Sequence, residues 1–99
     1  MNDRRKKGLE KEISRIIGMT ILTDVKNEKI KNLVTIHKTE LTKDGRYLDL
    51  TFSIMDLKNN VNKEKILEEL EKLKGFFRKT IGSQLSIRFV PEIRIHLDD

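Results

Sequence analysis

The feature that most constrains the fold of this sequence is a strict alternation of apolar and polar residues before position 55. The alternating residues are Leu48, Asp49, Leu50, Thr51, Phe52, Ser53 and Ile54. Successive side chains of a β-strand point to opposite faces of a sheet, so this pattern predicts a strand with one buried and one solvent-facing side. The chain is therefore expected to build a sheet that is covered on one face only.

A second strand is predicted immediately before this one. Val34 and Ile36 begin it, and it is expected to continue to about Leu41. The segment 42–46 then supplies turn residues, among them Asp44 and Gly45, and a glycine adopts the positive φ that tight turns require. The two strands are therefore predicted to form a hairpin.

A helix with an apolar stripe is predicted near the N-terminus. Its apolar residues, at helical spacing, are Leu9, Ile13, Ile16 and Ile17. Asn2 or Asp3 is expected to cap this helix, and Gly18 is placed to end it. The segment 19–32 begins with residues of high β-propensity but continues with Asn, Glu and Lys, so we expect a partly ordered linker there.

A second helical region follows the hairpin, and Asn62 is its expected N-cap. Its apolar stripe is formed by Ile66, Leu67, Leu70 and Leu73. Gly75 interrupts the pattern, which resumes at Phe77, Ile81 and Leu85. Gly82 lies inside this second piece. The region therefore reads as two consecutive helices joined near Gly75.

The last element is predicted to be a strand with Pro91 in its middle. Its alternating apolar residues are Ile87, Phe89, Ile93, Ile95 and Leu97. Proline lacks the N–H that a sheet requires, so this strand is expected to have a bulge or to lie at an edge there. One sheet face is predicted to carry the helices. The other, with Tyr47, Thr51, Arg88 and Arg94, is expected to face solvent.

These elements predict an α+β fold in the order α-β-β-α-α-β, with a three-stranded mixed sheet and helices on one face. The helical connection between the second and third strands favours a parallel, right-handed crossover. At 99 residues the chain is expected to form a single domain over 1–99.

The sequence gives little support to catalysis. It contains no cysteine, and its two histidines, His37 and His96, lie on different predicted strands without a clustered partner. The acidic residues of the second helical region alternate with lysines, as on a salt-paired solvent face. No nucleotide-binding loop is present. We therefore expect no enzyme activity, no metal, no cofactor and no small-molecule substrate.

Targeting features are also missing from the sequence. No apolar run approaches the ~20 residues that cross a bilayer, and the basic start is not followed by the apolar stretch of a signal peptide. The expectation is a cytoplasmic protein without a membrane partner.

The net charge of +5 is unevenly distributed. Residues 1–18 carry six Lys or Arg and three acids, and residues 72–94 carry six Lys or Arg and one acid. Residues 56–71 have the opposite balance, with three Lys and five acids. This polarity suggests a polyanionic partner, although basic residues also simply solvate helix faces.

Two groups of basic residues are candidates for contact with RNA. The first is the run Arg4, Arg5, Lys6 and Lys7, read as a mobile arm or a first helical turn that binds phosphates by charge. The alternative is a frayed, solubilising terminus. The second group lies in the second helical region, where a straight helix would place four residues on one face: Lys72, Gly75, Lys79 and Gly82. A helical glycine costs about 1 kcal/mol relative to alanine, so Gly75 suggests a kink or a close backbone approach. A plain helix–turn–helix junction is the competing interpretation.

The ordered set of motifs resembles bacterial ribosome-binding factor A, a domain similar to the type II KH fold. The segment Gly75-Phe76-Phe77-Arg78 resembles the family's G-F-hydrophobic-R motif. Residues 85–94, with the sequence LSIRFVPEIR, resemble its R-hydrophobic-V-P-E-hydrophobic ending. Residues 34–36 and 44–48 resemble the first strand and the hairpin entry, so the likeness covers nearly the whole chain. In this family an A-x-G helical kink replaces the usual G-x-x-G loop. Here the run is Leu73-Lys74-Gly75, which lacks the small first residue.

The resemblance implies a non-catalytic assembly factor that binds the 30S subunit and its 16S rRNA, assists late maturation and processing, and supports growth in the cold. We expect it to act as a monomer. Its expected RNA-binding residues are Arg4, Arg5, Lys6, Lys7, Lys72, Lys74, Gly75, Arg78, Lys79, Arg88 and Arg94. The alternative function is a KH-like binder of RNA or single-stranded DNA without ribosomal specificity. A small RNA-processing enzyme is the third candidate.

Overall fold

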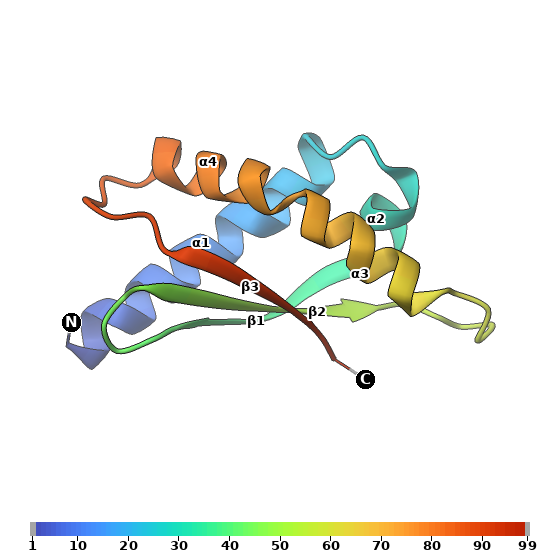
Figure 1. Cartoon of the computed structure of the whole chain (residues 1–99), viewed down its shortest axis with the longest axis horizontal. Helices are drawn as coiled ribbons and strands as arrows, with labels where there is room; N and C mark the ends of the chain where they lie inside the picture. The colour runs from blue at the N-terminus through green and yellow to red at the C-terminus, as the bar shows by residue number, and fades with distance from the viewer. Residues whose placement is uncertain (1, 99) are drawn as a thin grey trace.

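The structure is a computed structural model that describes residues 2–98 (Figure 1). Its elements are α1 (Asp3–Thr23), α2 (Glu28–Leu33), β1 (Val34–Leu41), β2 (Tyr47–Ile54), α3 (Lys63–Lys72), α4 (Lys74–Gln84) and β3 (Glu92–Leu97). The predicted order α-β-β-α-α-β is confirmed, with α2 as an addition. Asn2 caps α1 by accepting a hydrogen bond from the Arg5 N–H, and Asn62 caps α3 by accepting one from the Lys65 N–H.

The strands form one mixed sheet in the order β1-β2-β3. β1 and β2 are antiparallel, and the turn between them places Gly45 at φ 72°. β2 and β3 are parallel and are connected through α3 and α4. The expected hairpin and the expected parallel crossover are both confirmed. The register of β1 against β2 shifts between Ile36 and Lys38, which marks a bulge.

The core lies between one face of the sheet and the helices. Leu48, Leu50 and Phe52 of β2 are fully buried, as the alternation predicts, whereas the residues between them are partly exposed. α1 contributes most of the isoleucines that pack on them, and the ring of Phe77 from α4 stacks on Phe52 with centroids 6.2 Å apart. The α+β fold with helices on one sheet face follows from this burial pattern.

The expected linker over 19–32 is wrong. Gly18 does not end the first helix, which continues to Thr23 because Thr20 and Ile21 extend its buried face. A second helix follows, and the Asn27 side chain caps it by accepting hydrogen bonds from the N–H groups of Lys29 and Ile30. Only residues 24–27 connect the two helices.

The expected strand over 87–97 is also partly wrong. β3 begins at Glu92, after Pro91, and residues 85–91 form a loop between α4 and β3. Proline cannot donate to the neighbouring strand, so pairing starts only beyond it. Pairing only with β2, β3 lies at the edge of the described sheet, which was one of the two predicted alternatives. Because Arg88 lies in this loop, it does not belong to the open sheet face.

Candidate nucleic-acid interface

The junction between α3 and α4 is a one-residue break at Leu73. This residue has φ −88° and ψ −5°, and its N–H donates to the carbonyl oxygens of Leu70 and Glu71. The break thus precedes Gly75, which lies in the first turn of α4 and does not have a positive φ. Leu73 is partly buried against the core, which explains why a larger residue stands where the family has a small one. The helices are bent at the expected run, but glycine freedom is not what bends them.

A small groove of about 290 Å³ lies beside this junction. It is lined by Lys74, Gly75, Arg78, Glu92 and Ile93, so three of the predicted site residues come together there. A Cβ added to Gly75 would meet no atom within 4 Å, so the groove is open at this point. Because Gly75 has no side chain, another backbone can approach this side of α4 closely.

Arg78 has a structural task in this groove. Its Nε donates to the carbonyl oxygen of Pro91 at 3.1 Å, and its Nη2 donates to that of Val90 at 2.8 Å. The guanidinium thereby ties α4 to the loop before β3. The side chain is still exposed, so its positive charge contributes to the potential of the groove.

The lysines around the junction differ in their ionic partners. Lys72 lies 3.6 Å from a Glu69 carboxylate oxygen, and Lys74 lies 2.6 Å from one of Glu71. Such exposed pairs are worth only about 0–1 kcal/mol, so a phosphate can replace them at little cost. Lys79 has no ion-pair partner among residues 2–98 and projects from the exposed side of α4. It is the cation of this surface that is most readily offered to a polyanion.

The basic run at the N-terminus is helical. Arg4, Arg5, Lys6 and Lys7 form the first turns of α1, which agrees with the first-turn alternative and not with a mobile arm. Lys6 lies 4.0 Å from Glu10, and the other three side chains are exposed. A helix presents these charges in a fixed direction.

The open sheet face holds a compact polar cluster around Asp49. Arg94 makes a two-pronged ion pair with this carboxylate, with Nε–Oδ1 at 2.8 Å and Nη2–Oδ2 at 2.9 Å. The guanidinium also lies over the Tyr47 ring, 4.4 Å from its centroid, and His96 Nε2 lies 2.8 Å from Oδ1. Hydrogen bonding from Arg94, and then from His96, lowers the pKa of Asp49 below its ordinary value of 3.8. Arg94 is thus already engaged within the protein.

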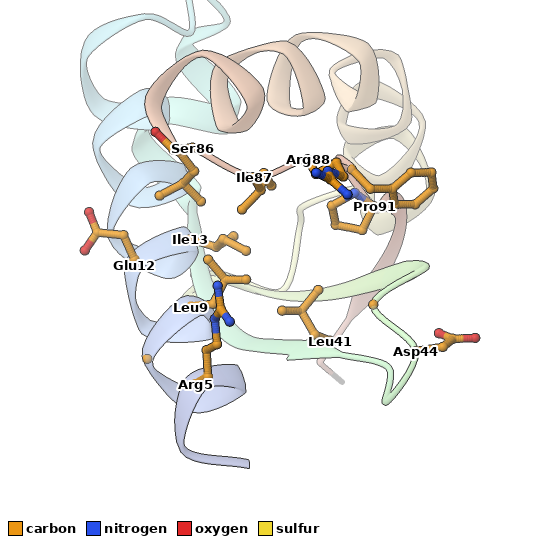
Figure 2. Close-up of a pocket in the computed structure, with 14 residues that line it drawn as sticks. Arg5, Leu9, Glu12, Ile13, Leu41, Asp44, Ser86, Ile87, Arg88 and Pro91 are labelled. Carbon is orange, nitrogen blue, oxygen red and sulfur yellow. The ribbon is translucent and has the colours of Figure 1, made fainter. Parts of the chain in front are cut away.

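Arg88 does not lie on the sheet face of Arg94 but lines the same cavity as a different predicted residue. Arg5 and Arg88 both line a larger cavity, of about 750 Å³, between the start of α1 and the loop 85–91 (Figure 2). The sequence analysis assigned these two arginines to separate surfaces. It nominated none of the apolar residues of this cavity, because only the tertiary fold brings them together.

Comparison with known proteins identifies the family. The family model for ribosome-binding factor A matches residues 5–99. The chain belongs to the ribosome-binding factor A family. Ribosome-binding factor A of Fusobacterium nucleatum is 43% identical over 103 aligned positions, which cover 100% of this chain and 86% of that protein. The resemblance stated from the sequence motifs is therefore confirmed.

Solved structures of similar proteins share this fold. A Thermotoga maritima protein studied by NMR as a candidate ribosome-binding factor A has a TM-score of 0.81 and 35% identity, covering 100% of this chain and 92% of that one. A homology model of Thermus thermophilus ribosome-binding factor A was fitted into a cryo-EM map of its 30S complex. It has a TM-score of 0.69 and 18% identity, covers 88% of both chains, and shows the likeness of fold alone.

The motif of the ribosome-binding factor A family can now be read residue by residue. In Gly75-Phe76-Phe77-Arg78, Phe77 is buried against Phe52 and Arg78 holds the loop before β3. Gly75 and the partly exposed Phe76 remain at the surface. Half of the motif therefore builds the fold, and half remains exposed at the surface.

Across residues 2–98, no three or more His, Cys, Asp or Glu side chains are grouped so that they could hold a metal ion. Within the same part of the chain, no helix has the length and apolar character needed to cross a membrane.

Proposed function

We propose that this protein is a non-catalytic factor that binds the small ribosomal subunit through its RNA and assists late maturation of that subunit in the cytoplasm. The observation that carries the proposal is membership of the ribosome-binding factor A family over residues 5–99. The Thermus thermophilus relative was placed in a 30S complex, which supports the same class of partner. We further propose that the chain acts as a single-domain monomer.

The groove beside Gly75 is the proposed contact with 16S rRNA. Lys74 and Arg78 supply positive charge within the groove, Lys79 lies exposed one helical turn beyond Gly75, and Gly75 leaves room for a sugar–phosphate backbone. Glu92 at the opposite wall disfavours phosphate there, which would restrict a strand to the α4 side. Binding that prefers one RNA conformation shifts its population by the difference in affinity, and no covalent chemistry is required.

The test is equilibrium binding to purified small and large subunits. We expect preference for the small subunit, and we expect Lys79→Ala to weaken binding. The matched control is Lys58→Ala, because Lys58 is equally exposed but lies in the loop between β2 and α3, away from the groove. Gly75→Ala should also weaken binding if a backbone approaches α4 there.

Three outcomes would contradict parts of this proposal. Equal affinity for both subunits and for unrelated RNA would favour a KH-like binder without ribosomal specificity. Unchanged affinity in both Gly75→Ala and Lys79→Ala would remove the groove from the interface and leave the subunit preference standing. RNA cleavage by the purified protein would support the enzyme alternative.

A further inference from the structure

The cavity at the start of α1 has features of a ligand site distinct from the groove beside Gly75. It lies where the first turns of α1, the β1–β2 turn and the loop 85–91 meet (Figure 2). Its volume of about 750 Å³ falls within the ~300–1,000 Å³ typical of sites that enclose small ligands. The groove beside Gly75 shares no lining residue with it.

The inner surface of this cavity is apolar. Leu9, Ile13, Leu41, Ile87 and Pro91 line it; Ile13 and Leu41 are buried beneath this surface, and Leu9 and Ile87 are partly exposed and form its accessible apolar part. Gly8 forms part of the wall, and a Cβ built there would meet no atom within 4 Å. The helix thus leaves an opening at this position, and the interior can receive a flat apolar group.

Two arginines at the rim are available to bind an anion. Among residues 2–98, the guanidinium groups of Arg5 and Arg88 have no hydrogen-bond or ion-pair partner. Two carboxylates also lie at the rim, but within the described residues only Glu12 is ion-paired, so Asp44 keeps its negative charge and a phosphate is expected on the side of Arg5 and Arg88. Glu12 accepts a hydrogen bond from Arg15 at 3.2 Å, and Asp44 accepts one from the Thr42 hydroxyl at 2.7 Å.

The loop that carries Arg88 is held in place from α4. Arg78 donates to the carbonyl oxygens of Val90 and Pro91, as described above. Gly82 also approaches this loop closely, since a Cβ there would lie 3.1 Å from Val90 Cγ2. On this fixed segment Phe89 lines the cavity with its side chain 60% exposed, although aromatic side chains are usually well covered.

We infer that this cavity receives one unstacked base of a single-stranded RNA segment, while Arg5 and Arg88 hold the flanking phosphates. Single-stranded RNA is recognised by bases that splay out and stack on aromatic side chains. Arginine matches phosphate in a two-pronged geometry, which suits the two rim positions. The inference rests on the proposed function, because the cavity would be a second site on the same RNA-binding protein, one that takes a single base.

A direct test uses a short single-stranded oligouridylate and a counterpart of equal length and charge with abasic positions. We expect the methyl NMR signals of Leu9, Leu41 and Ile87 to shift saturably with the first and not with the second. The affinity for the abasic strand should be about ten-fold lower, because stacking of the base is lost. Equal affinities would mean that only phosphates are bound and would overturn the inference.

Two variants with matched controls locate the site. Gly8→Leu should fill the entrance and reduce oligouridylate affinity, while its melting temperature should not fall, because leucine is the better helix former and Gly8 is exposed. Asn32→Leu is the control, because it places the same apolar side chain on the exposed side of α2 and keeps the net charge. Arg88→Gln should weaken binding more than Lys58→Gln, although both remove one charge.

The outcomes separate this inference from the proposed function. If Gly8→Leu and the wild type bind the small subunit equally, and also bind oligouridylate equally, the proposed function stands and the base site is refuted. Loss of subunit binding in Gly8→Leu with unchanged oligouridylate affinity would assign the cavity to a protein partner, which also refutes it. Base-dependent oligouridylate binding at the cavity without any subunit preference would support the site and reject the ribosomal function.

Discussion

Gly75 and Gly82 are both helical residues of α4, yet their surroundings differ. Gly75 faces open space, whereas a Cβ at Gly82 would approach Val90 Cγ2 to 3.1 Å. Neither glycine has a positive φ. Gly75→Ala should therefore raise the free energy of unfolding by up to about 1 kcal/mol, and Gly82→Ala should gain less or lose stability.

Chemical denaturation of the two alanine variants checks this order. The control is Val90→Ala combined with Gly82→Ala, because removing the Val90 methyl groups should restore the helix gain relative to Val90→Ala alone. A Gly82→Ala variant at least as stable as Gly75→Ala would show that the loop yields freely and that the close approach is not a constraint.

The pair of Arg94 and Asp49 should make stability depend on pH in the acidic range. Arg94 lowers the pKa of Asp49 below 3.8, so the stability that ionised Asp49 contributes is fully present above that value and is lost as pH falls through the lowered pKa. Arg94→Gln should lower the free energy of unfolding at pH 7 only modestly, since both groups are near the surface. Urea unfolding of both proteins should show this difference at pH 7 and a much smaller one well below pH 3.8, where Asp49 is protonated. A difference that does not change with pH would mean that Arg94 acts through packing on Tyr47.

At the scale of elements, Arg78 connects α4 to the loop that precedes β3. Arg78→Lys keeps the charge but cannot reproduce two directed hydrogen bonds to the carbonyl oxygens of Val90 and Pro91. We expect a loss of about 1–2 kcal/mol in unfolding free energy. Amide hydrogen exchange should also become faster within 85–91. The control Lys79→Arg should change neither quantity, and equal exchange in Arg78→Lys would contradict the connection.

The helix α2 depends on its N-cap. Asn27 accepts hydrogen bonds from the N–H groups of Lys29 and Ile30, at 3.0 and 3.3 Å, and Ile30 is fully buried. Asn27→Ala should reduce the unfolding free energy by about 1 kcal/mol. Thermal unfolding beside the control Asn60→Ala, an exposed loop residue, tests this, and equal effects of the two changes would argue against the cap.

The elements that were predicted correctly have an unambiguous period. The alternation in β2 predicts only a strand and the apolar stripe of α3 predicts only a helix, because in each element one face is buried and determines the spacing of the apolar residues. The linker predicted over 19–32 is wrong because a glycine does not by itself end a helix: Gly18 lies inside α1, where a Cβ would meet Ile36 Cγ2 of β1 at 3.9 Å, an ordinary packing distance. The signal was present in the Asn27 cap and in the apolar spacing that continues to Ile21. The strand predicted over residues 87–91 is a loop, because these alternating residues have no neighbouring strand to pair with and Pro91 cannot donate a hydrogen bond to one.

At the scale of the molecule, the charges lie at different ends of the fold. Figure 1 places the start of α1, the β1–β2 turn and the loop before β3 at one end, and the start of α3 with the loop before it at the other. The first end carries Arg4, Arg5 and Arg88, and the second carries the acidic segment 56–71. Sequence could nominate each basic residue. It could not place Arg5 and Arg88 at the same cavity, since that arrangement comes from the packing of α1 against α4 and its following loop.

This polarity predicts a steep salt dependence of RNA binding. If about five phosphates are neutralised, the logarithm of the binding constant should fall against the logarithm of salt concentration with a slope of about −3.5 to −4.5. Lys79→Ala should make the slope shallower by about 0.7–0.9, because one counterion fewer is released. Lys58→Ala, at the acidic end, should leave the slope unchanged.

Replacing Arg4, Arg5, Lys6 and Lys7 together by alanine should reduce the slope further while leaving the melting temperature nearly the same, since three of these side chains are exposed and Lys6 makes one long ion pair. Binding to purified small subunits across a salt series measures all four proteins. A flat response in the wild type, or an equal change in Lys58→Ala and Lys79→Ala, would show that RNA contact does not follow the charge polarity of the fold.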